Sequence, residues 1–268
     1  MFVFSKRGVG AAATLVMALS ACGGGGSDDT GATDSGGNSA TAQAAAPEEI
    51  AITISDTTFE MPETLEAEPV NLTVTNDAED PHRTFFARLN EGVTPEKVQK
   101  TFAKNPEAVF PLITVAGSLD MTKPGDTTEA TIQFPEGTYL VVDPESKGPP
   151  PVGFFEVTVA AGEEVAAPEA DWKIETGEFF FRVDEAAAGE ALVEISNIGE
   201  QGHEVILGRP GKGEGSEAGF FLAPAPGGKM WVTLDLEPGE YELLCYFPDP
   251  KSGKPHIKLG MKQPLTVE

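Results

Sequence analysis

The chain has 268 residues, with 43 acidic against 18 basic side chains and a formal net charge of −25. This excess of negative charge repels phosphate backbones and anionic headgroups, so it argues against nucleic acid and a bare anionic membrane as partners. It favours cations or a basic protein instead.

The first 21 residues have the pattern of a secretory signal peptide. Lys6 and Arg7 precede an apolar run over residues 9–19 that is too short to span a bilayer. The run ends in LSAC at residues 19–22, which resembles a bacterial lipobox. The resemblance implies that Cys22 carries lipid and anchors an extracytoplasmic protein to a bacterial membrane, on its periplasmic or cell-surface face. An ordinary signal peptide, with Cys22 incidental, is the alternative.

Residues 22–48 are rich in Gly, Ser, Thr, Ala and Asp and contain almost no large apolar side chain. Such a segment cannot bury enough surface to offset the entropy of ordering, so we expect a flexible tether. No later stretch is apolar enough for a transmembrane helix.

The rest of the chain contains an internal repeat. Residues 59–82 and 180–203 align without a gap at an offset of 121, and they share a leading Phe, Asn76 with Asn197, and a terminal His82 with His203. Residues 135–142 similarly match residues 237–244. The repeat predicts two related domains, at residues 49–160 and 171–268, with the boundary in residues 160–170.

The predicted elements are mostly strands. Segments such as NLTVTN, ALVEIS, HEVILG, MWVTLDL and YELLCYF are apolar or alternate, with Gly and Pro between them. This pattern favours an all-β fold with one β-sandwich in each half. The Pro-Gly turn in LEPGEY predicts an antiparallel hairpin of residues 230–236 and 241–247. One short helix is expected in the first half, with Thr94 as its N-cap and Pro95 at its first position.

Four soft or nitrogen donors occur in the second half. His203 follows a predicted strand, whereas Cys245, His256 and Met261 surround the loop before the final strand. Two His, one Cys and a weak axial Met form the donor set of a blue-copper site. If Cys22 carries lipid, Cys245 is the remaining thiol, and in an oxidising compartment it needs burial or a metal.

The order of these donors resembles that of the cupredoxins. The segment SNIGEQGHEVIL is similar to their first-His segment, and GEYELLCYFPDPKSGKPHIKLGMKQPLTV is similar to their Cys-His-Met segment. The resemblance covers roughly residues 171–268 and implies one copper ion held by His203, Cys245, His256 and Met261. The ten residues between Cys245 and His256 exceed the spacing of most small cupredoxins. Copper nitrite reductases also lengthen this loop.

The first half has the scaffold of a cupredoxin-like domain without the donors. Asp143 stands at the position of Cys245, and His82 alone matches a ligand. We interpret His82 as an ordinary surface or turn histidine. The fold predicted for the chain is thus two tandem cupredoxin-like Greek-key sandwiches, the first of them degenerate.

The resulting functional hypothesis is one-electron transfer with a redox protein partner, with His256 on an exposed loop as the electron port. A copper carrier or storage protein with a copper-exchange partner would use the same donors. A non-metal, partner-binding β-sandwich is the other alternative. Enzyme activity is not expected, because a multicopper oxidase or a complete nitrite reductase needs many more than three histidines.

Overall fold

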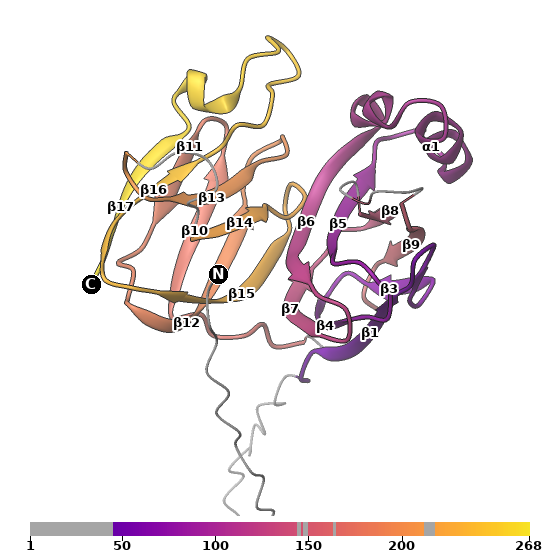
Figure 1. The fold of residues 1–268 in the computed structure, drawn as a ribbon, viewed down its shortest axis with the longest axis horizontal. Helices are drawn as coiled ribbons and strands as arrows, with labels where there is room; N and C mark the ends of the chain where they lie inside the picture. The colour runs from indigo at the N-terminus through magenta and orange to yellow at the C-terminus, as the bar shows by residue number, and fades with distance from the viewer. Residues whose placement is uncertain (1–44, 144–145, 147–149, 163–164, 212–217) are drawn as a thin grey trace, which may run out of the picture. The chain divides into compact units, whose positions relative to one another are not determined.

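The computed structural model describes residues 45–143, 146, 150–162, 165–211 and 218–268 (Figure 1). The signal peptide, Cys22 and the tether up to residue 44 lie outside these ranges. No helix in the described ranges is long and apolar enough to cross a membrane.

The first half is a β-sandwich of two sheets. One layer has the strand order β7-β4-β1-β2 and the other has the order β3-β9-β8-β5-β6. The strands are β1 (Glu48–Ile54), β2 (Phe59–Glu60), β3 (Thr64–Glu66), β4 (Pro69–Asn76), β5 (His82–Leu89), β6 (Ile113–Thr122), β7 (Thr127–Gln133), β8 (Gly137–Val142) and β9 (Val152–Thr158).

The second half repeats this architecture. Its layers have the orders β11-β10-β12-β15 and β14-β13-β16-β17. The strands are β10 (Trp172–Gly177), β11 (Phe180–Val183), β12 (Gly189–Asn197), β13 (Glu204–Gly208), β14 (Gly219–Leu222), β15 (Lys229–Leu236), β16 (Gly239–Leu244) and β17 (Lys262–Val267). Each half begins with a parallel pair, β1 with β4 and β10 with β12. The two topologies correspond except at β3, whose place in the second half is taken by the single parallel bridge between Ala186 and Val267.

The two halves share one continuous sheet. Strand β15 pairs antiparallel with β7, with Met230 opposite Ile132, and this joins four strands from each half into an eight-stranded sheet (Figure 1). A single cluster of buried apolar side chains runs through both halves. The all-β prediction is confirmed, and so is the prediction of one β-sandwich in each half; the domain limits remain a prediction.

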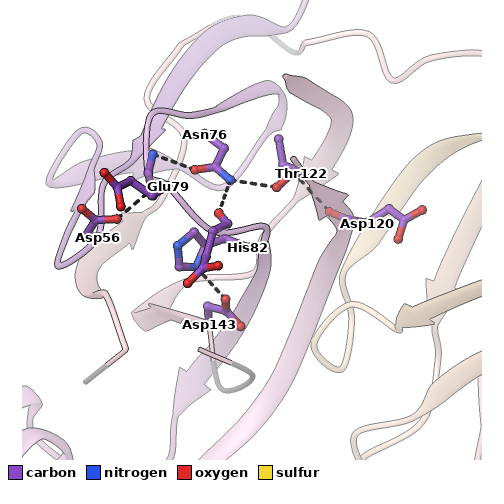
Figure 2. A network of polar contacts seen from close by, with 9 residues as sticks. Asp56, Asn76, Glu79, His82, Asp120, Thr122 and Asp143 are labelled. Carbon is purple, nitrogen blue, oxygen red and sulfur yellow. Dashed lines mark hydrogen bonds and ion pairs between the residues drawn. The ribbon is translucent and has the colours of Figure 1, made fainter. Parts of the chain in front are cut away.

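The repeat extends to individual hydrogen bonds. Asn76 Nδ2 donates to the carbonyls of Asp80 and Thr122, at 2.9 and 2.8 Å (Figure 2). Asn197 Nδ2 donates to those of Gln201 and Pro224, at 2.8 and 3.0 Å. The Oδ1 of each Asn accepts a backbone N–H two residues further on. The shared Asn therefore closes the same loop in both halves, and this loop leads to His82 in one half and His203 in the other.

The predicted helix is confirmed, as α1 (Pro95–Phe102). The Thr94 side chain accepts a hydrogen bond from the backbone N–H of Lys97, and Val98 faces a small apolar cluster. Two short 3₁₀ segments, η1 (Pro106–Leu112) and η2 (His256–Leu259), complete the secondary structure of the described residues.

The predicted hairpin of residues 230–236 and 241–247 is wrong. Strand β15 pairs with β12 and β7, whereas β16 pairs with β13 and β17 in the opposite layer. The turn arches between the layers because the Tyr241 hydroxyl donates to the carbonyl of Glu237, four residues back, at 2.9 Å. Tyr139 makes the same contact with Pro135 at 2.6 Å. These are tyrosine corners, which are typical of Greek-key sandwiches.

We predict that Asn197→Ala lowers the free energy of unfolding by about 2–4 kcal/mol, because it leaves buried backbone groups without partners. Chemical denaturation of the metal-free protein measures this change. Asn197→Asp keeps the Oδ1 acceptor but turns a second acceptor oxygen toward the carbonyls of Gln201 and Pro224, so it should destabilise the protein at least as much as Asn197→Ala. A change below the error of the measurement in Asn197→Ala would contradict the structural role of the Asn loop.

Candidate metal centre

Three of the four predicted donors meet inside the second sandwich. The Nδ1 atoms of His203 and His256 lie 3.2 Å apart, and Cys245 Sγ lies 3.4 Å from His256 Nδ1. All the ligand atoms lie within 4.8 Å of one another, and all three residues are fully buried. Residues 42 or more positions apart in sequence are brought together by the sandwich, because the loops after β12 and β16 open at the same end.

Backbone hydrogen bonds fix the loop that carries His256. The N–H of His256 donates to the carbonyl of Phe247 at 2.9 Å, and the N–H of Ile257 donates to that of Cys245 at 2.7 Å. Cys245 follows the last residue of β16 directly, and His256 is the first residue of η2. The loop is therefore closed at its base, which holds Cys245 and His256 side by side.

Met261, the fourth predicted donor, lies just beyond η2. Its N–H donates to the carbonyl of His256 at 3.0 Å, and its side chain is fully buried within the main apolar cluster. Its backbone is thus tied to that of a candidate ligand.

Gln201 sets the tautomer of His256. Gln201 Oε1 lies 3.2 Å from His256 Nε2. Because this oxygen can only accept, Nε2 carries the ring proton and Nδ1 keeps its lone pair. That lone pair faces His203 and Cys245, which is the state that a metal-binding imidazole requires. Nothing in the sequence pattern distinguished Gln201 from any other polar loop residue.

Glu204 holds the Cys245 segment from two directions. Its backbone N–H donates to Cys245 Sγ at 3.3 Å, and its carboxylate Oε2 accepts from the N–H of Tyr246 at 2.9 Å. An N–H bond to sulfur stabilises a thiolate and orients it. Sequence reasoning missed Glu204 as well, although its place directly after His203 was a usable signal.

Aromatic side chains cover His256, so its predicted exposure is wrong. The Phe179 ring lies edge-on with its centroid 5.0 Å from that of His256, and the Phe247 ring lies 6.5 Å away. Phe179 is the one non-glycine residue with positive φ, +66°, in the described part of the chain. Such a backbone conformation is costly for a bulky residue. Phe179 adopts it where its ring covers His256.

Burial makes the metal-free donors neutral. It lowers the pKa of His203 to about 4, with the neighbouring His256 adding to the effect. Burial also lowers the pKa of His256, partly opposed by Asp249 and Glu178. For Cys245, burial raises the pKa to about 11, despite the N–H of Glu204. Two neutral imidazoles and a thiol therefore face one another.

The donors fit a trigonal metal site. Ligand bonds of about 2.0–2.3 Å to nitrogen and sulfur would place neighbouring donors of such a site about 3.5 Å apart. Two of the observed separations, 3.2 and 3.4 Å, are close to this spacing, and the third, between His203 and Cys245, is within 4.8 Å. No acidic side chain belongs to the cluster.

The equivalent place in the first half holds a hydrogen-bonded pair. His82 Nδ1 lies 2.7 Å from Asp143 Oδ2, and both residues are buried (Figure 2). Asp143 follows β8 as Cys245 follows β16, so its predicted correspondence is correct. The interpretation of His82 as a surface or turn histidine is wrong, because the carboxylate replaces the thiol as its buried partner.

The first half also touches the candidate centre. A Cβ added to Gly202 would clash with Val115 Cγ2, so the residue before His203 must be glycine while Val115 is in place. Nearby, the backbone N–H of Leu222 donates to the Ser118 hydroxyl at 2.9 Å. Both contacts come from β6, which therefore supports the His203 loop from outside its own sandwich.

No family model matches the chain, and neither does any curated protein. Among solved structures, it is similar to a reduced auracyanin from Roseiflexus castenholzii, with 20% identity over 36% of this chain and 94% of that one and a TM-score of 0.29. Auracyanin A, a blue copper protein from Chloroflexus aurantiacus, is 17% identical over 41% and 99%, with a TM-score of 0.27. A blue copper oxidase from Nitrosomonas europaea is 15% identical over 83% and 86%, with a TM-score of 0.25. Likeness at this level carries no argument about function, which has to come from the donor atoms.

We predict that the metal-free protein loses stability as the pH falls from 6.5 to about 4. The unfolded chain protonates His203 in this window and the folded chain does not, because its folded-state pKa is lowered. The loss should be about 3 kcal/mol at most. Urea unfolding at pH 7.5, 5 and 4 measures it, and His203→Gln should have a visibly shallower dependence. An identical dependence in both proteins would contradict the assignment.

Proposed function

We propose that this chain is a copper protein that transfers one electron at a mononuclear site of the blue-copper type, with His203, Cys245, His256 and Met261 as its ligands. One observation carries the proposal. Two imidazole nitrogens and a thiol converge in a fully buried site, with the lone pair of His256 already directed into it. Such an arrangement is costly unless a soft cation fills it.

The donor set favours copper over zinc. Structural zinc sites have four Cys or His ligands, and catalytic zinc sites add a water to three. Here the fourth donor in the same turn is a methionine, which is a poor zinc ligand and a known weak ligand of copper. The shell of Phe179, Phe247 and the main apolar cluster keeps water away.

The protein holds the donor side chains in fixed positions. Copper contributes the one-electron couple when it is bound. Cys245 would give up its thiol proton and bind as thiolate, with the N–H of Glu204 donating to the sulfur. Gln201 holds the His256 ring, and the base of the loop fixes Cys245 and His256 together. Donors that cannot move favour fast electron transfer, because little reorganisation accompanies the change of charge.

Loop structure favours electron transfer over copper delivery. A carrier would gain from a mobile ligand loop that lets the ion leave. In this loop Pro248 and Pro255 form a β-bridge, and the N–H of Asp249 donates to the carbonyl of Lys254 at 2.9 Å. The Asp249 carboxylate also accepts from the N–H of Ser252 at 2.8 Å. The long loop is thus a folded turn, which suits a carrier poorly.

The proposed site of action is the periplasmic or cell-surface face of a bacterial membrane. The signal-like N-terminus and the lipobox-like Cys22 support an extracytoplasmic, lipid-anchored protein. The tether expected ahead of the first sandwich would let the folded halves reach a redox partner. Three histidines in the sequence favour an electron carrier over an enzyme with further copper centres.

We predict an intense visible charge-transfer band when cupric ion is added to the purified protein, with one copper per chain. Cys245→Ser should abolish the band, because the band needs the thiolate. His82→Gln, which alters the buried pair of the first half, should leave both band and stoichiometry unchanged. Absorption spectroscopy with metal analysis decides this. The absence of a band in the unaltered protein, or its loss in His82→Gln, would overturn the ligand assignment.

We also predict that Gln201→Leu weakens copper binding about 10- to 100-fold, the usual effect of removing a hydrogen bond to a ligating imidazole. Gln201→Glu retains an acceptor at His256 Nε2 and should bind copper within a few-fold of the unaltered protein. Competition with a copper chelator measures both affinities. Equal affinities in all three proteins would show that Gln201 does not position His256.

A further inference from the structure

A groove lies beside the proposed metal centre, between β6 of the first half and the Cys245–His256 loop of the second. Its volume is ≈ 700 Å³. One wall comes from the end of η1 and the start of β6, including Phe110 and Ile113. The other wall includes Gln201, Tyr246 and Phe247.

The groove is apolar and its rim is open. Phe110 is 58% exposed and Tyr246 is 50% exposed, so two large aromatic side chains stand at its edge in solvent. Exposed aromatic residues beside an apolar depression are typical of protein docking sites, where they supply most of the binding energy. Because one of these residues belongs to each half, the groove exists only in the two-half protein.

The groove carries negative charge. Glu200, Glu204 and Asp249 are among its lining residues, and no Lys or Arg belongs to the lining within the described part of the chain. The formal net charge of the whole sequence, −25, has the same sign. A partner that enters the groove should therefore be positively charged around an apolar side chain.

The groove wall is in contact with the proposed ligands. Gln201 lines the groove and hydrogen-bonds His256 Nε2 at 3.2 Å, and Phe247 lines it and packs near the same imidazole. Tyr246 is bonded directly to Cys245. Because His256 itself is fully buried, a partner in the groove would approach the centre through these three residues rather than through an exposed imidazole.

We propose that this groove is the docking site for the redox partner, and that the partner is a protein with a lysine-rich surface around an apolar side chain. This inference rests on the proposed electron-transfer function. It gives the first half a task, since η1 and β6 form one wall of the site. With copper bound, one electron would pass between the ion held by this chain and the metal or cofactor of the partner, so that one is oxidised as the other is reduced and no bond is made or broken.

Binding can be tested without copper. A lysine-rich cytochrome c serves as the probe and is titrated into the ¹⁵N-labelled, metal-free mature chain at low ionic strength. Phe110→Ser and Glu200→Lys should each weaken binding about five- to tenfold, through lost apolar contact and lost charge complementarity respectively. Asp235→Lys makes the same charge reversal on an exposed part of β15 outside the groove and should change binding less than twofold.

Electron exchange is then measured by stopped flow on the copper-loaded chains, in whichever direction is downhill. The rate constants with cytochrome c should fall by the same factors, with the visible band and the reduction potential unchanged. A small cationic cobalt phenanthroline complex, which oxidises the reduced chain, is the second reactant, and Phe110→Ser should not slow its reaction.

Three results would overturn the docking site. Asp235→Lys could weaken binding as much as Glu200→Lys, which would show that only net charge matters. Phe110→Ser could leave binding unchanged, or it could slow the cobalt complex as much as cytochrome c, which would indicate a cleft for small cations. A failure of the copper proposal is distinguishable, since it would remove the visible band and leave the metal-free titration interpretable.

Discussion

Burial of three lone-pair donors against one another is the constraint on which the rest of this centre depends. At most one proton fits between two Nδ1 atoms 3.2 Å apart, and His203 Nε2 has no hydrogen-bond partner although it is buried. Polar groups placed in this way cost stability in the empty protein. Phe179, held at positive φ over His256, adds backbone strain at the same place. The scaffold therefore stores an unfavourable arrangement that a bound cation would relieve.

Both halves hold a buried histidine in the same way, but the hydrogen-bond partner of that histidine differs between them. An Asn-closed loop leads to the histidine, and a tyrosine corner precedes the strand that ends at its partner. In the first half the partner is Asp143, which hydrogen-bonds His82 and completes the site internally. In the second half the partner is Cys245, whose neutral thiol is a weak donor, and His203 Nε2 is left buried without a hydrogen-bond partner. The change from Asp143 to Cys245 at matching positions, together with His256, thus separates a closed structural pair from a cluster that could hold a metal.

The sequence was sufficient for features that depend on local pattern or on rare residues. The Thr94–Pro95 start of α1, the Asn76 and Asn197 repeat, and the grouping of His203, Cys245 and His256 could all be predicted. The pairing of β15 with β7 could not, because contacts between distant edge strands leave no local signal. The Pro-Gly turn before Tyr241 fitted a hairpin locally, whereas the tyrosine corner sends the strand to the other layer. The composition of the loop around His256, rich in Pro, Gly and Lys, predicted an exposed histidine. His256 is buried because Phe179, which is distant in sequence, packs against its ring.

The first half supplies no ligand of the candidate centre, but it makes contacts with β15 and the His203 loop that explain why the protein keeps it. Without β7, strand β15 would present an open edge, which invites association with other chains. Without β6, the Leu222 N–H would lose its buried acceptor, and Gly202 would lose the Val115 side chain that fills the space beside it. His203 would then sit in a loop supported from one side only. Because the ligand spacing depends on that loop, the first half contributes to the precision of the centre without supplying any of its donors.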